Sequence, residues 1–422
     1  MDQQAWNDED GVSLMSNENK IVLFACVGHF FTHFYELLFP SLAIPLTIYL
    51  GLPLADVLTL SFLMYLLYGL GALPWGFFSD RVGHRISIVI FFVGTGAGAV
   101  LTSFAQEPAF IVASLAMIGF FASIYHPAGT ALITHGTRKR GMALGINGVA
   151  GNLGLVSAPF VAGLFNWLFG WQITYLLIGI VALFWGIILI FVSIDEEPVV
   201  PDTKPAPVPG NSSRNNNGRL FIILCVIMTI SGLAYRSNSI VLPSYLEFKA
   251  QFLFDLFTRF KIGDLQGAKT FSATLLASCI YIISTVGQLA GGRLADKYDL
   301  RFMYILFHSL SLPFVIIMAF TGQMWLVIAA SLYVFFALGM QPIENSLIAK
   351  LTPSKWRSTA FGLKFILTFG VGSLAVYIVG WIKEYWSLSA VYLFVALTIV
   401  LLISVIIVLI ATSRGMSCRN TD

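Results

Sequence analysis

The stretch GFFSDRVGHR, residues 76–85, returns later in the chain as GRLADKYDLR, residues 292–301. Four positions repeat with a constant offset of 216 residues, namely Gly76 with Gly292, Asp80 with Asp296, Arg81 with Lys297 and Arg85 with Arg301. Further matches lie close to this offset: Pro127 with Pro342 at 215, and Gly145, Gly163 and Tyr175 with Gly362, Gly380 and Tyr392 at 217. The chain therefore consists of two halves that repeat one pattern, and a binding site is expected where the halves meet.

Each half is rich in apolar segments long enough to cross a bilayer. The 422 residues are 57% hydrophobic and 11% charged, with a mean hydropathy of +0.84, whereas soluble domains carry about 25% charged residues. A membrane-spanning helix needs roughly 20 apolar residues. Twelve segments meet this need, near residues 21–47, 55–78, 86–104, 109–133, 142–168, 172–194, 220–246, 271–292, 302–320, 324–350, 357–382 and 388–412. The composition predicts an all-α integral membrane protein in contact with lipid, with no nucleic-acid partner.

A polar stretch separates the two halves. Residues 195–219, DEEPVVPDTKPAPVPGNSSRNNNGR, are rich in Pro, Asn and Ser and carry few bulky apolar side chains. Such a segment cannot bury enough surface to offset the entropy of ordering, so a flexible linker is predicted. The expected organisation is an N-terminal tail (1–20), a six-helix bundle (21–194), the linker (195–219), a second six-helix bundle (220–412) and a C-terminal tail (413–422).

The placement of basic residues predicts the orientation of the chain in the membrane. Of the 24 Lys and Arg, 17 lie in the termini and even-numbered loops, five lie in odd-numbered loops, and Arg236 and Lys364 lie inside spans. The positive-inside rule then places both termini in the cytoplasm. Residues 1–20 lack the basic start, apolar middle and cleavage site of a signal peptide. The long loop at residues 247–270 combines aromatic and basic residues and predicts a short interfacial helix.

The motif at residues 76–85 resembles the signature of the major facilitator superfamily of secondary transporters. It has a glycine, three residues, Asp-Arg, one residue, a second glycine and two basic positions, the first of them taken by His84. The resemblance covers essentially the whole chain, and it implies two pseudo-symmetric six-helix bundles in a bacterial cytoplasmic membrane. It also implies a cytoplasmic gate formed by Gly76, Asp80, Arg81, Gly83, Arg85, Gly292, Asp296, Lys297 and Arg301. A role of Arg81 and Arg85 in topology alone stays open.

A second motif bears on the direction of transport. Gly145, Gly154, Pro159 and Gly163 in the fifth span are similar to the helix-packing signature of the family's antiporters. Ala158 and Ala162 replace two glycines of that signature, and the family's basic residue near the start of helix 4 is missing. Small residues still allow close helix packing, and the motif favours export by exchange for protons.

A narrower resemblance concerns two short stretches. IYHPAG, residues 124–129, and the position of His29 resemble the fosmidomycin-resistance branch of bacterial exporters. This chain has His33 where that branch is expected to carry an acidic residue.

Titratable residues inside the spans are the candidates for a substrate and proton pathway. His29, His33 and Glu36 share one face of the first helix, and such groups at membrane depth mostly face a bundle interior or a water-filled path. Other spans add polar groups: His126, Asn147, Arg236, Gln341, Glu344 and Lys364. Repeat offsets of 203, 217 and 215 align His33 with Arg236, Asn147 with Lys364, and His126 with Gln341. Polar residues at equivalent positions are expected to line a cavity between the halves.

The residue types indicate roles for these groups. Arg236 and Lys364 are expected to attract an anionic or polar group, while His33, Glu36 and His126 handle coupling protons, as Glu344 also can. Two alternatives stay open. In the first, the histidines and Glu36 only form hydrogen bonds to neighbouring helices. In the second, Arg236 and Lys364 form permanent ion pairs with Glu36 and Glu344 and do not contact the substrate.

The spacing of His29 and His33 also suits a metal on a helix face. Since no cysteine, aspartate or HExxH pattern joins them, no metal is predicted. No ATP-binding motif is present, and no cofactor is predicted.

The sequence as a whole predicts a secondary transporter, not an enzyme. It would move a small molecule by alternating access, by proton-coupled efflux, and is expected to act as a monomer. Proton-coupled import of an organic anion is the alternative, and a membrane sensor that does not transport is a third reading.

Overall fold

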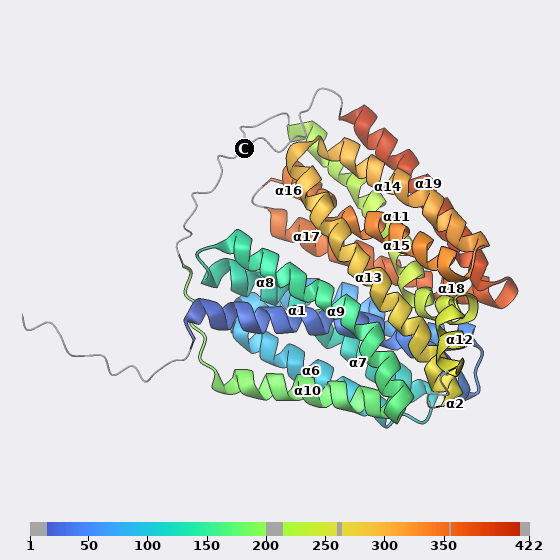
Figure 1. Cartoon of the computed structure of the whole chain (residues 1–422). Coiled ribbons are helices and arrows are strands. Elements are labelled where there is room, and N and C mark those ends of the chain that lie inside the picture. The colour runs from blue at the N-terminus through green and yellow to red at the C-terminus, as the bar shows by residue number, and fades with distance from the viewer. Residues whose placement is uncertain (1–14, 200–213, 260–263, 354–355, 414–422) are drawn as a thin grey trace, which may run out of the picture.

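The structure of the protein is a computed structural model that describes residues 15–199, 214–259, 264–353 and 356–413. In these ranges helices are the only regular elements (Figure 1). Eleven of them are long and apolar enough to cross a membrane, and a pair bent by 116°, Ala43–Leu50 and Leu54–Leu70, raises the number to twelve. The predicted all-α membrane fold is confirmed.

The first half of the chain forms ten helical pieces. They are α1 (Asn17–Ser41), α2 (Ala43–Leu50), α3 (Leu54–Thr59), α4 (Phe62–Leu70), α5 (Ala72–Val82), α6 (His84–Ser103), α7 (Pro108–Ala122), α8 (Tyr125–Gly136), α9 (Arg140–Phe169) and α10 (Trp171–Phe191). Some spans consist of several pieces, and the expected segment 55–78 is the run α3, α4 and α5.

The second half repeats this plan. It contains α11 (Arg214–Lys249), α12 (Phe252–Arg259), α13 (Leu265–Lys297), α14 (Leu300–Phe320), α15 (Gln323–Gly339), α16 (Gln341–Leu351), α17 (Arg357–Phe365), a π-helix η2 (Ile366–Gly370), a 3-10 helix η3 (Val371–Leu374), α18 (Ala375–Tyr385) and α19 (Leu388–Thr412). The short α12 lies in the long loop for which an interfacial helix is predicted.

Glycines with positive φ separate several helices. Gly51, Gly83 and Gly170 have φ angles of 65°, 97° and 87° and follow α2, α5 and α9. A side chain is disfavoured in this conformation, so these positions let the chain turn directly into the next helix. At some other helix starts, those of α1, α13, α14 and α19, a side-chain oxygen of the preceding residue accepts a hydrogen bond from a free N–H of the first turn. Asp264 does so for α13 by accepting a hydrogen bond from the N–H of Gly267 at 2.7 Å.

Two spans are broken at equivalent places near their middles. The fourth span breaks between α7 and α8, and the tenth breaks at Met340 between α15 and α16. His126-Pro127 and Gln341-Pro342 lie in the first turn of the second piece, where proline fits because the N–H that it lacks has no helical partner. The breaks therefore bring His126 and Gln341 to equivalent positions in the two halves.

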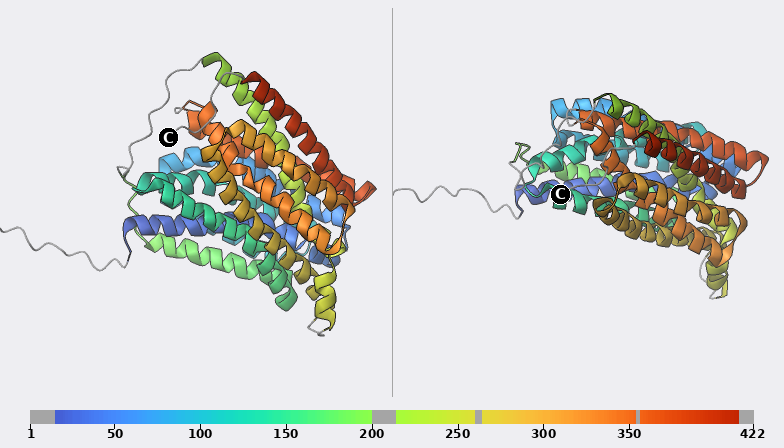
Figure 2. Two further views of the ribbon diagram at one scale, coloured as in Figure 1. Left: turned by 45° about the horizontal axis from the view of Figure 1, so that its top comes forward. Right: turned by 90° about the horizontal axis from the view of Figure 1, so that it is seen from above.

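The helices form two bundles that diverge toward one side of the molecule (Figures 1 and 2). The side that carries the start of α1 and the ends of α10 and α19 is called the linker face. The bundles meet where α9 packs on α13, where α4 packs on η2, and where α1 packs on α11. A Cβ at Gly163 of α9 would lie within bonding distance of the Thr274 hydroxyl of α13, so only glycine permits this close approach.

Candidate functional site

A cavity of about 1060 Å³ lies between the two bundles. Its wall runs from Asp80, His135 and Thr359 at the linker face to His29 and Tyr281 deep in the molecule. Six of the nine predicted pathway residues line it: His29, His33, His126, Gln341, Glu344 and Lys364. The other three, Glu36, Asn147 and Arg236, lie outside its wall. The bundles thus enclose a space with several polar groups on its wall, open on the linker side, at the place that the internal repeat predicts.

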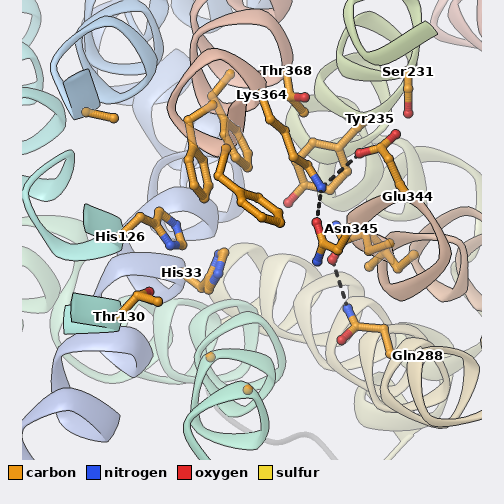
Figure 3. Close-up of a pocket in the computed structure, with 18 of the residues that line it drawn as sticks. His33, His126, Thr130, Ser231, Tyr235, Gln288, Glu344, Asn345, Lys364 and Thr368 are labelled. Atoms are coloured by element: carbon orange, nitrogen blue, oxygen red, sulfur yellow. Dashed lines mark hydrogen bonds and ion pairs between the residues drawn. The ribbon is translucent and has the colours of Figure 1, made fainter. Parts of the chain in front are cut away.

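Three histidines of the first bundle share one side of the cavity. His29 and His33 lie one turn apart on α1, and His126 reaches them from the first turn of α8. Each offers one ring nitrogen, and the three nitrogens lie within 4.8 Å of one another. Figure 3 shows His33 and His126 pointing into the same space.

Every one of these histidines has a protein partner on one ring nitrogen. His29 Nδ1 lies 2.7 Å from the backbone oxygen of Asn147, and His33 Nδ1 lies 2.9 Å from Glu36 Oε2. His126 Nε2 lies 3.0 Å from the Tyr68 hydroxyl. These contacts fix the orientation of each ring. Asn147 therefore influences the cavity only indirectly, because its backbone oxygen orients the His29 ring. Its side-chain Oδ1 accepts a hydrogen bond from the Tyr125 hydroxyl at 2.7 Å.

On the facing wall, Lys364 of α17 joins Glu344 and Asn345 of α16. Its Nζ lies 2.8 Å from Glu344 Oε1 and donates to Asn345 Oδ1 at 2.7 Å (Figure 3). Tyr304 of α14 donates to the second Glu344 oxygen. The π-helix η2 begins two residues after Lys364, and such bulges are frequent at functional sites. Amine and carboxylate are both at the cavity surface.

A chain of amides crosses the floor of the cavity between the bundles. Asn152 Nδ2 on α9 donates to Gln288 Oε1 on α13 at 2.9 Å, and Gln288 Nε2 donates to Gln341 Oε1 on α16 at 3.3 Å. Each amide keeps hydrogen-bond donors or acceptors that these two bonds do not use. The row of amides can therefore also bind a polar group of a ligand.

Glu36 and Arg236 form a second ion pair, which is sealed from the cavity. Arg236 Nη2 donates to Glu36 Oε1 at 3.0 Å, and the two side chains are 0% and 1% exposed. The guanidinium carbon lies 3.6 Å from the centre of the Tyr65 ring. The pair joins α1 of the first bundle to α11 of the second. Arg236 therefore has no surface on the cavity in this conformation.

Several residues of the site were not expected from the sequence. They are Tyr68, Asn152, Tyr235, Gln288, His308, Asn345 and Thr368, all on the cavity wall or bonded to it. Each is a single polar residue on a span. Such residues are common in membrane helices, and one alone does not predict a binding site. Only the position of Asn345 beside Glu344 was a usable hint.

The gate residues at the linker face hold the ends of helices. Arg85 Nη2 donates to the backbone oxygens of Leu189 and Ile190 at 2.8 and 2.7 Å, which caps α10. Arg301 Nη1 donates to the backbone oxygen of Ser413 at 2.7 Å, directly after α19. Each arginine thus ties the last helix of its own bundle to the repeated motif.

The paired glycines and charged residues of the gate behave alike in the two halves. Gly76 and Gly292 face Pro127 and Pro342, with Cβ positions 3.5 and 3.9 Å from the proline Cβ atoms. Gly83 takes the positive φ that ends α5. Four charged members, Asp80, Arg81, Asp296 and Lys297, are exposed. Among the described residues Asp80 and Asp296 form no ion pair, so the latch that the family resemblance implies is not made in this conformation.

The glycine motif of α9 divides into packed and open positions. A Cβ at Gly154 would lie 2.2 Å from the backbone oxygen of Phe30 on α1, and Gly163 contacts α13. Gly145 has no atom within 4 Å of its Cβ position. Pro159 lies inside the helix and is buried. Close helix packing therefore rests on the second half of the motif.

Comparison with known proteins places this architecture in one group. Residues 24–263 and 224–417 match the sequence profile of the Major Facilitator Superfamily. A curated relative, the riboflavin transporter RibZ of Clostridioides difficile (strain 630), is 22% identical over 339 residues, which cover 70% of this chain and 72% of that protein.

Solved structures share the fold at low sequence identity. The nucleoside transporter NupG has a TM-score of 0.72 at 12% identity, with 92% of this chain and 99% of that chain covered. A bacterial homologue of the human lysosomal transporter Spinster, inward-facing and occupied, has a TM-score of 0.69 at 14% identity, covering 94% and 97%. A POT family transporter in complex with 5-aminolevulinic acid has a TM-score of 0.72 at 14% identity, covering 95% and 97%.

Proposed function

The chain belongs to the Major Facilitator Superfamily and is a multi-pass membrane transporter, not an enzyme, and we propose that it carries a small molecule with an anionic group across the membrane together with a proton. The observation that carries the proposal is the Lys364–Glu344 pair, in which a cation and a titratable group 2.8 Å apart face one cavity. Energy would come from the proton gradient of a bacterial cytoplasmic membrane.

The linker face is the cytoplasmic face in this proposal. Arg81, Arg85, Arg138 and Lys139 lie there in the first half, whereas the opposite face carries few basic residues, and cytoplasmic loops of membrane proteins are enriched in Lys and Arg. The cavity then opens to the cytoplasm. The conformation is inward-facing, and the contacts of α1 with α11 and of α3 with α18 close the opposite side.

Coupling follows from the charges on the cavity wall. A buried lysine balances one carboxylate, not two. When an anionic group of the substrate binds Lys364, Glu344 loses its cation and takes up a proton, because two negative charges beside one amine are unfavourable in a buried site. Substrate and proton then cross together. The Tyr304 hydroxyl, already bonded to Glu344, holds the carboxyl group in place in both states.

Export by exchange for protons is the second candidate. The close approaches of Gly154 and Gly163 favour it, since they reproduce the packed part of the antiporter motif in α9. In that case the substrate would compete with the proton for the Glu344 carboxylate. No negatively charged group of the substrate would then bind Lys364.

Proton movement in proteoliposomes tests both candidates. Vesicles carrying the purified protein and an internal pH dye are challenged with short dicarboxylates, amino acids, phosphonates and riboflavin. The proposal expects one of the anions to carry protons in its own direction. Proton movement against the substrate would favour exchange, and substrate movement with no proton movement would contradict coupling.

A matched pair of variants assigns the coupling group. Glu344→Gln is expected to abolish substrate-driven proton movement and to keep substrate-for-substrate exchange, because glutamine imitates the protonated acid. Glu247→Gln is the control. Glu247 is also buried, at 4% exposure, but lies on α11 outside the cavity wall and accepts a hydrogen bond from Gln266 at 3.4 Å. Equal loss in the two variants would remove Glu344 from the coupling step.

A further inference from the structure

We propose that His29, His33 and His126 form a binding site for a divalent transition-metal ion of the zinc class, on the cavity wall that faces Lys364. The three residues come from two helices and two distant parts of the sequence, and each offers one ring nitrogen that lies within 4.8 Å of those of the other two. Imidazole is the usual nitrogen ligand of such ions. The inference does not depend on the proposed substrate or on the direction of transport.

The hydrogen bonds of two histidines leave a lone pair on the second ring nitrogen of each. His29 Nδ1 faces a carbonyl oxygen, which can only accept, so this nitrogen carries the proton and Nε2 is free. His33 Nδ1 faces the carboxylate of Glu36 in the same way. A metal-bound histidine almost always donates its other N–H to a carbonyl or a carboxylate. Both histidines are therefore oriented as metal ligands are.

The third histidine completes the set from α8. His126 Nε2 lies 3.0 Å from the Tyr68 hydroxyl, which can accept a hydrogen bond; in the tautomer that donates there, His126 keeps a lone pair on Nδ1. Its ring centre lies 5.5 Å from those of both His29 and His33. Zinc–nitrogen bonds of about 2.0–2.1 Å place tetrahedral ligand atoms about 3.4 Å apart. Closing the triad on an ion thus requires side-chain shifts on the order of 1 Å, without movement of the helices.

The surroundings make room for the triad. A Cβ at Gly151 of α9 would lie 2.7–2.9 Å from three atoms of the His29 ring, so glycine at this position is needed for the ring to lie where it does. Gly151 is one residue from Asn152 and is itself on the cavity wall. The site is consequently built from three helices, with α9 supplying both the space and the Asn147 carbonyl.

An ion at this site would have an open coordination position toward the cavity. Three protein ligands leave the fourth for water or for a ligand atom of another molecule. Glu36 is already balanced by Arg236, and Glu344 by Lys364. The two positive charges of the ion are therefore not neutralised by the neighbouring pairs, and the fourth ligand is expected to be an anion.

Metal titration of the purified full-length protein tests the proposal. The protein is purified in detergent with an affinity tag free of histidine, and Zn²⁺ and Co²⁺ are added in separate calorimetric titrations. Co²⁺ also reports its ligands through visible absorption. We expect one equivalent of each ion to bind, with a Co²⁺ spectrum typical of a four-coordinate nitrogen site. Absence of binding by the wild type would overturn the proposal.

Variants distinguish the triad from other metal-binding groups in the chain. His33→Gln and His126→Gln are each expected to weaken Zn²⁺ binding at least 100-fold, and Gly151→Ala to weaken it about tenfold by displacing the His29 ring. His308→Gln is the matched control, since it removes another buried histidine of the same cavity, and it is expected to change affinity less than twofold. Thermal unfolding of the metal-free variants verifies that each is folded. Unchanged binding in His126→Gln, or an equal loss in His308→Gln, would contradict the site.

Discussion

The two buried ion pairs of this transporter each join a glutamate to a basic side chain, but they differ in their access to the cavity. Glu36 and Arg236 are sealed, at 1% and 0% side-chain exposure, and they join the two bundles through α1 and α11. Glu344 and Lys364 lie within one bundle and face the central cavity, with Lys364 10% exposed. A sealed pair can change only when the helices around it move. A pair on a cavity wall can change whenever a ligand arrives.

This difference assigns different tasks to charges that look alike in the sequence. The sealed pair lies between α1 and α11 on the closed side of the cavity, so it must separate if the bundles part there during alternating access. The cavity pair need not separate for a conformational change and is available to a substrate and a proton. We therefore propose that the first pair is part of a gate and that the second is part of the binding site.

The largest expected effect comes from removing the sealed cation. Arg236→Met leaves Glu36 buried without its partner, which costs about 3–5 kcal/mol. Lys364→Met is expected to cost less, on the order of 1–3 kcal/mol, because cavity water can reach Glu344. Thermal unfolding in detergent measures both, and Glu36→Gln should restore much of the stability of Arg236→Met. A larger loss in Lys364→Met would reverse the comparison.

The cavity pair should instead dominate substrate binding. Lys364→Gln removes a charge-assisted hydrogen bond to an anionic substrate, worth about 1.5–3 kcal/mol, or roughly 10- to 150-fold in apparent affinity. Concentration dependence of uptake into proteoliposomes is the measurement. Gln323→Asn, on the face opposite the linker, serves as a control that should change affinity little. Wild-type affinity in Lys364→Gln would move the substrate site elsewhere.

Helix contacts between the bundles give the next effect. Gly163→Ala places a methyl group against Thr274 of the other bundle, and such overpacking typically costs 1–3 kcal/mol. Gly145→Ala, in the same helix and motif, meets open space and should be neutral or gain up to about 1 kcal/mol of helix propensity. The difference between their unfolding midpoints measures the contact. Equal midpoints would show that the bundles do not rely on glycine here.

The smallest effect concerns the linker face. Partial burial would raise the pKa of Asp299, but hydrogen bonds from Arg301 outweigh it and hold the pKa below its ordinary value of 3.8. A carboxylate with a lowered folded-state pKa contributes stability above that ordinary value, and the contribution is lost as pH falls through the folded-state pKa. The unfolding midpoints of wild type and Asp299→Asn should therefore converge below about pH 4. A constant difference across the pH range would exclude this source of stability.

The sequence predicted the fold well because hydropathy and the internal repeat are long-range patterns with many matching positions. Expected and observed spans agree within a few residues at most ends. The break before His126 and the break before Gln341 lie beside prolines, and the repeat had already paired these positions. The π-helix after Lys364 was not foreseen, since Phe365–Phe369 contains no proline and reads as ordinary apolar helix.

Six of the nine candidate residues line the cavity, and the pairing of Arg236 with Glu36 and of Lys364 with Glu344 is one of the alternatives that the sequence left open. Glu36 and Arg236 are 200 positions apart, and no local pattern shows that these two meet while Glu344 takes Lys364. The sequence also named His29, His33 and His126 without showing that they converge, because the angle between α1 and α8 is set by tertiary packing. Depth of burial, which separates the two pairs, is likewise a property of the assembled bundles.

We expect the Glu36–Arg236 pair to hold the bundles closed opposite the linker face and the Glu344–Lys364 pair not to do so. Pulsed electron spin resonance between labels at Ile48 and Tyr385, which are 61% and 63% exposed on that face, measures the separation directly. Each pair is replaced in a double variant, Glu36→Gln with Arg236→Met, and Glu344→Gln with Lys364→Met. A longer label distance is expected in the first variant and a wild-type distance in the second. A wild-type distance in the first variant, or a longer distance only in the second, would show that the Glu36–Arg236 pair does not hold this side closed.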